Sequence, residues 1–259
     1  MNNHPFHLVE KSPWPLIMSM SMLTFTLGMV SWFLNSNMML LLVGLISMML
    51  CLTQWFRDMI RESTFQGLHT NMVTKNMKLG MILFIISEIM FFLSFFWCFF
   101  HSSLSPSVEI GLTWPPFNIK SFNPMSIPLL NTMILLSSGV SLTWAHGSIL
   151  MLNYTQALKS IIITILLGFY FTMLQLYEYM MASFCISDSI FGSTFFVSTG
   201  FHGVHVLMGT MFIMISMMRL KNLHFSNNHH VGFECSAWYW HFVDVVWLFL
   251  YIFIYWWGN

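Results

Sequence analysis

Glu88 is the residue whose position most needs a chemical explanation, because it is an acid inside an apolar stretch from Leu79 to Phe100. Nine helical residues rise about 14 Å, which places Glu88 near the middle of a hydrocarbon layer about 30 Å thick. Its neighbours in the sequence offer no opposite charge, so desolvation favours the neutral acid and we expect a protonated carboxyl at neutral pH. We predict proton handling at Glu88. The alternative is a protonated acid that only hydrogen-bonds to another helix.

A second group of ionisable residues, Glu234, His241 and Asp244, lies in the last apolar stretch. Spacings of seven and three residues put them on one side of a helix, which we expect to face protein rather than lipid. His241 and Asp244 are one turn apart and can pair, which lowers the cost of burying each. We interpret them as a structural polar pair, with a proton relay as the alternative.

A third group contains His202 and His205, one helical turn apart, with Gly200 and Gly203 beside them. The glycines are expected to permit close approach of another helix. The histidine spacing suggests a metal or haem site, but no Glu follows His202 as in a zinc-protease motif, and one turn cannot supply both axial ligands of a haem. His146 lies near the end of its own stretch, away from the pair. We therefore predict no metal and no catalytic residue in this chain.

A polar segment after the second apolar stretch mixes aromatic, cationic and acidic groups. Its candidate lipid-binding residues are Trp55, Arg57, Arg61, Glu62 and His69. A guanidinium can hold a phosphate through two parallel hydrogen bonds, and Arg219 beside Lys221 offers a second such point. The pattern predicts binding of phospholipid head groups, and ordinary positive loop charges are the alternative.

The composition excludes several classes of protein. Of 259 residues, 57% are hydrophobic and only 7% are charged, which is too little charge for a water-facing surface. Nine basic and nine acidic residues give no net charge, so no field exists to hold nucleic acid. In lipid, only helices and closed barrels satisfy the backbone, and the continuous apolar runs favour helices.

Seven apolar stretches are long enough to span a membrane, which predicts an all-α membrane protein with seven transmembrane helices. They cover about 14–34, 38–55, 79–100, 127–152, 158–181, 190–218 and 233–257. We divide the chain into a two-helix part over 1–70, with a polar segment at its end, and a five-helix bundle over 71–259. The loop from His101 to Ser126 is apolar and rich in proline, and we expect it to pack over helix ends.

The cationic residues predict the orientation of the chain. Seven spans place eight of the nine on the side of the N-terminus and leave Lys120 opposite. The eight are Lys11, Arg57, Arg61, Lys75, Lys78, Lys159, Arg219 and Lys221.

These residues, taken with several longer stretches, resemble the cytochrome c oxidase subunit III family. The matching stretches are Trp55 to Thr70, Gly80 to His101, Trp114 to Pro116, Pro128 to Thr132, Ser138 to Ser141, Gly192 to Val206 and Gly232 to Trp257. Together they cover most of the chain, and the last, with its run from Trp238 to Asp244, is the most specific.

The resemblance implies a fold and a setting. Helices one and two are separated from helices three to seven by a cleft filled with phospholipids, and the N-terminus faces the matrix of the mitochondrion. Family members bind no haem or copper themselves, because the redox centres belong to subunits I and II, beside which this chain would pack together with small accessory subunits. Glu88 matches a carboxyl implicated in proton handling, and Trp55, Arg61, Glu62, His69 and Arg219 match positions that contact lipid.

We therefore hypothesise a non-redox core subunit of a respiratory oxidase in the mitochondrial inner membrane. It would stabilise the catalytic core, hold phospholipids and support proton uptake. The alternative is an autonomous proton-coupled transporter, although the sequence lacks the inverted repeats that are typical of such folds.

Overall fold

The computed structural model describes residues 6–259, so the first five residues of the predicted 1–70 part lie outside it. Within the described range the chain is helical and has no strand. Seven helices are long and apolar enough to cross a membrane, which confirms the predicted fold class. They are α1 Trp14–Asn35, α2 Met39–Thr64, α3 Asn71–Leu104, α4 Ile127–Leu150, α5 Tyr154–Met180, α6 Ser189–Lys221 and α7 Val231–Leu250, which continues as the π-helix η2 Tyr251–Trp257.

Two helices extend beyond the membrane spans predicted for them. α2 continues to Thr64 through most of the polar segment, and α3 begins at Asn71, eight residues before the predicted start. Hydropathy marks only the part of a helix that suits lipid, whereas backbone hydrogen bonds continue wherever the side chains permit them. The chain divides into two compact units, Met1–Met77 and Lys78–Asn259, so the first turns of α3 belong to the unit of α1 and α2.

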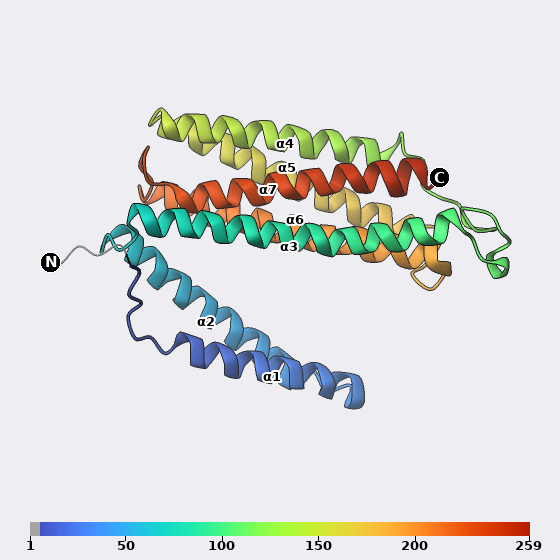
Figure 1. Cartoon of the computed structure of the whole chain (residues 1–259), viewed down its shortest axis with the longest axis horizontal. Coiled ribbons are helices and arrows are strands. Elements are labelled where there is room, and N and C mark those ends of the chain that lie inside the picture. Colours follow the sequence, from blue (N-terminus) through green and yellow to red (C-terminus); the bar gives the residue numbers. More distant parts are fainter. Residues whose placement is uncertain (1–5) are drawn as a thin grey trace. The chain divides into compact units, whose positions relative to one another are not determined.

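In the first unit, α1 and α2 form a hairpin (Figure 1). Two glycines allow the two helices to pack closely against each other. A Cβ atom on Gly28 would lie 2.4 Å from the backbone nitrogen of Leu41, and one on Gly44 would lie 2.5 Å from that of Phe25. Each glycine therefore admits the backbone of the opposite helix, as is typical of helix pairs in membranes. Near the open end of the hairpin, Trp14 Nε1 donates a 2.6 Å hydrogen bond to Asp58 Oδ2.

In the second unit, α4, α5, α6 and α7 form a bundle in which α4 packs against α5 and α7, and α6 packs against both α5 and α7. Trp240 is fully buried at its centre, and its Nε1 donates a 2.9 Å hydrogen bond to Ser138 Oγ. Gly168 and Gly209 make room for this indole, since a Cβ on either would lie 2.8 Å from the ring.

The prediction that Gly200 and Gly203 admit a neighbouring helix was wrong. A Cβ on either residue would meet no atom within 4 Å. The glycines that permit close packing are Gly168 and Gly209, which lie on other helical faces. Sequence spacing alone does not tell which face of α6 turns inward.

The loop between α3 and α4 packs over helix ends, as predicted. Trp114 makes edge contacts with Phe99 of α3 and Phe191 of α6. Phe122 packs on Phe184 and on Phe195 of α6.

We expect Gly28→Ala to destabilise the hairpin, because the added methyl group would collide with backbone rather than with a side chain that can move. The matched control is Gly80→Ala, which places the same group in open space at another helical position. Thermal unfolding of the purified protein in detergent should show a lower midpoint for Gly28→Ala only. Equal midpoints for the two variants would contradict the close helix contact.

Candidate functional site

Glu88 of α3 has a partner that the sequence did not identify. Its Oε2 lies 2.9 Å from Nε2 of His205, which α6 supplies. The two side chains are 23% and 12% exposed, and the aromatic rings of Phe91 and Phe92 lie beside His205. An acid and a base therefore meet inside the spans, beside aromatic rings.

The hydrogen bonds of His205 fix how many protons this pair holds. Its Nδ1 lies 2.7 Å from the carbonyl oxygen of Phe201, and because a carbonyl oxygen only accepts, Nδ1 must carry a proton. The 2.9 Å contact between Nε2 and Glu88 then requires one further proton between the two atoms. That proton lies on the carboxyl when the pair is neutral and on the imidazole when the pair is ionic.

His202 faces a different helix from His205. It is buried, and its Nε2 lies 3.2 Å from the carbonyl oxygen of Val243 on α7. The two histidines thus point to different helices, and one bound ion or haem would not use both.

The structure brings His241 and Asp244 near one another, but not to hydrogen-bond distance. His241 Nδ1 lies 3.9 Å from Asp244 Oδ2. The side chain of Asp244 is 8% exposed and that of His241 is 41% exposed. Gly139 of α4 provides the space, because a Cβ there would lie 2.9 Å from Asp244 Oδ2. Glu234, two turns away, instead pairs with Lys78 and His230.

The predicted lipid-binding residues of the first unit lie at the end of α2 and just after it. Arg57 is exposed and bonds Asp58 at 3.0 Å, while the side chain of Arg61 is 56% exposed. Glu62 Oε2 lies 3.6 Å from Nε2 of His7, whose ring contacts that of His69 edge-on. Trp55 is half-buried. Cationic groups are thus available to solvent here, beside aromatic ones.

Arg219, in the second unit, lies at the end of α6. Its guanidinium stacks over the ring of Phe225 at 4.7 Å, and it lies against Gly232, where any side chain would collide with it. Its Nε is buried and has no hydrogen-bond partner among the described residues.

Sequence reasoning missed a second buried acid, Glu178 of α5. Tyr255 of η2 donates a 2.5 Å hydrogen bond to its Oε1, and Gln175 Nε2 lies 3.4 Å from the same hydroxyl. Asn131 of α4 extends the chain of contacts to Gln175 at 3.4 Å. The signal was present, since Gln175 and Glu178 are polar residues one turn apart in an apolar stretch.

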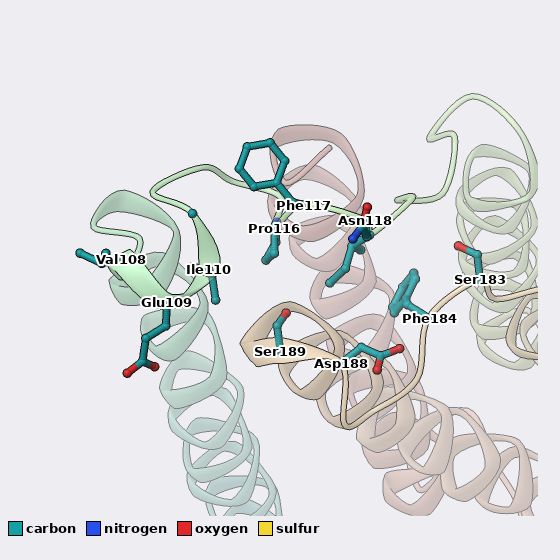
Figure 2. A pocket seen from close by; sticks show the side chains of 12 residues that line it. Val108, Glu109, Ile110, Pro116, Phe117, Asn118, Ser183, Phe184, Asp188 and Ser189 are labelled. Atoms are coloured by element: carbon teal, nitrogen blue, oxygen red, sulfur yellow. The ribbon is translucent and has the colours of Figure 1, made fainter.

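The structure also contains a surface pocket of about 600 Å³ between the α3–α4 loop and the start of α6 (Figure 2). Glu109 and Asp188 are its acidic lining residues. Asp188 Oδ2 accepts a 2.7 Å hydrogen bond from the backbone nitrogen of Cys185, so this carboxylate stabilises the loop before α6. None of the predicted site residues lines the pocket.

Seven spanning helices, with ionisable side chains held in pairs inside them, define a multi-span integral membrane protein. A model of the family "Cytochrome c oxidase subunit III" matches residues 4–259. The chain belongs to this family, whose members are components of the oxidoreductase complex cytochrome c oxidase.

The similarity to known members extends over the whole chain. It is 61% identical over 257 residues to cytochrome c oxidase subunit 3 of Aedes aegypti, covering 99% of this chain and 98% of that one. The corresponding proteins of Drosophila melanogaster and Locusta migratoria are 60% and 58% identical over 258 residues, each covering 100% of this chain and 98% of the relative. The predicted family is thereby confirmed.

We expect Asp244→Asn to weaken assembly of the oxidase more than its chemistry. An amide at this buried position changes the group that faces His241 and removes the carboxylate that can attract it. The measurement is the yield of intact complex on native gels, together with turnover per assembled complex. Glu109→Gln, the same chemical change on an exposed loop, is the control.

A normal yield of Asp244→Asn complex with impaired proton-linked turnover would contradict the structural role. It would favour the proton relay instead.

Proposed function

We propose that this chain is a non-redox core subunit of the respiratory oxidase in the mitochondrial inner membrane. It stabilises the catalytic core, holds phospholipids and supports proton uptake during oxygen reduction. Haem and copper belong to the neighbouring subunits I and II, and small accessory subunits complete its surroundings. The N-terminus lies in the matrix and the C-terminus faces the intermembrane space, in accordance with the distribution of Lys and Arg.

The observation that carries the proton-handling role is the bond between Glu88 and His205. Because Nδ1 of His205 is committed to a backbone carbonyl, the bond between the two side chains holds one transferable proton. This proton can lie on either side chain without leaving an unpaired charge in lipid, and when it leaves the pair one negative charge stays on Glu88 until another proton arrives. A purely structural acid would need only one fixed donor or acceptor.

The lipid-binding role is supported by cationic charge at two separate places, the first of which is also exposed. One is the end of α2 with the residues after it, where Trp55, Glu62 and His69 accompany the exposed Arg57 and Arg61. The other is Arg219, whose Nε lacks a partner among the described residues. A lipid phosphate is a suitable acceptor for such guanidinium groups, since it carries the opposite charge and matches their planar fork.

We expect Glu88→Gln to leave assembly intact but to slow steady-state turnover or shorten the working life of the oxidase. The amide can still donate to Nε2 of His205, so the contact persists, but the transferable proton is lost. Oxygen reduction itself should continue, because its centres lie in other subunits. The measurements are turnover, proton stoichiometry and inactivation rate of the assembled complex.

The matched control for Glu88→Gln is Glu109→Gln, which makes the same change on an exposed loop and should alter none of the three quantities. If all three also stayed at their wild-type values in a fully assembled Glu88→Gln complex, the proton-handling role would be excluded.

We expect Arg219→Ala to lose phospholipid that co-purifies with the complex. Arg219→Lys keeps the charge but not the two parallel donors, and it should retain only part of that lipid. Lys159→Ala removes an exposed charge at the start of α5 and is the control. Lipid mass spectrometry of the purified complexes gives the comparison, and identical lipid content in wild type and Arg219→Ala would refute the assignment.

A further inference from the structure

Three potential metal ligands meet where α4 ends and α7 begins. His146 Nε2 lies 3.4 Å from His230 Nε2, and His230 Nε2 lies 3.3 Å from Glu234 Oε1. One ligand atom from each residue lies within 4.8 Å of the other two. In a tetrahedral zinc site with bonds of about 2.0 to 2.1 Å, neighbouring ligand atoms are about 3.3 to 3.4 Å apart. The two shortest separations therefore already match edges of such a tetrahedron.

The protonation of His230 favours a metal rather than a simple hydrogen bond. Its Nδ1 lies 3.0 Å from the carbonyl oxygen of Ser226 and must donate to it. In the neutral imidazole, Nε2 then carries a lone pair, which points toward His146 and Glu234. A backbone carbonyl that holds the far nitrogen is the usual support of a metal-binding histidine, because it fixes both the tautomer and the orientation of the ring.

Glu234 divides its two oxygens between different partners. Oε1 faces His230, while Oε2 forms an ion pair with Lys78. A metal bound at Oε1 leaves this ion pair in place, so Lys78 would orient the carboxylate rather than compete for the same oxygen. The side chain of Glu234 is 17% exposed and that of His230 is 5% exposed, so few waters compete with the protein ligands.

We propose that His146, His230 and Glu234 form a zinc-binding site. Two neutral imidazoles and one carboxylate suit this ion, and three protein ligands leave a fourth position for water. The site would join the end of α4 to the start of α7. It is distinct from His202 and His205, on which the sequence-based prediction of no metal was founded.

The test is zinc binding by the purified oxidase complex, with zinc ion alone as the probe. Equilibrium dialysis and metal analysis should show one zinc less per complex in His146→Ala than in wild type. The loss in affinity should be at least the roughly tenfold to hundredfold that follows removal of a supporting hydrogen bond in other zinc sites. His229→Ala is the matched control, since it removes the histidine next to His230 and should leave the zinc count unchanged.

The position of the ion gives an independent measurement. Anomalous diffraction at the zinc edge should place a peak about 2.0 to 2.1 Å from both Nε2 atoms in zinc-soaked crystals of the complex. This also separates the site from His7, Glu62 and His69, whose ligand atoms likewise lie within 4.8 Å of one another. Absence of a peak between His146 and His230, or an unchanged zinc count in His146→Ala, would overturn the proposal.

Discussion

Lipid offers no hydrogen bond, and this constraint governs where the polar side chains of the chain lie. The helices satisfy the hydrogen bonds of their own backbone groups. The polar side chains within the spans must therefore form hydrogen bonds with one another. Trp240 donates a hydrogen bond to Ser138, Tyr255 donates one to Glu178, and Glu88 is hydrogen-bonded to His205. Each bond joins two different helices, so satisfying the polar groups and fixing the packing of the bundle are one and the same requirement.

The glycines follow from this constraint. An indole as large as that of Trp240 reaches Ser138 only if the helices around it leave space, and Gly168 and Gly209 supply that space. Gly139 does the same for Asp244. Small residues in this bundle are therefore placed opposite bulky or ionisable ones, which differs from a simple stripe of small residues along one helix.

Much of the fold could be predicted from the sequence, because the length and hydropathy of a spanning helix are local properties. The number of spans and their approximate positions followed from them. The polar partners could not be predicted in the same way. Glu88 was identified as an acid in need of an explanation, but its pairing with His205 depends on the rotation and depth of α3 relative to α6. Those quantities are set by packing across the whole bundle. The same reason explains why Gly200 and Gly203 were assigned to a contact they do not make.

The Glu88–His205 and Glu234–His230 sites differ in a way that separates their chemistry. In both, a backbone carbonyl accepts a hydrogen bond from the histidine Nδ1–H, and Nε2 faces a carboxylate. At Glu88, His205 is the one basic partner among the described residues, and it lies within the spans beside aromatic rings, so a proton is the cation that suits the pair. At Glu234 a second imidazole joins, and the group lies at the helix ends, where hydrated ions arrive. One local arrangement thus suits proton exchange or metal binding according to how many lone pairs converge and how far from the helix ends they lie.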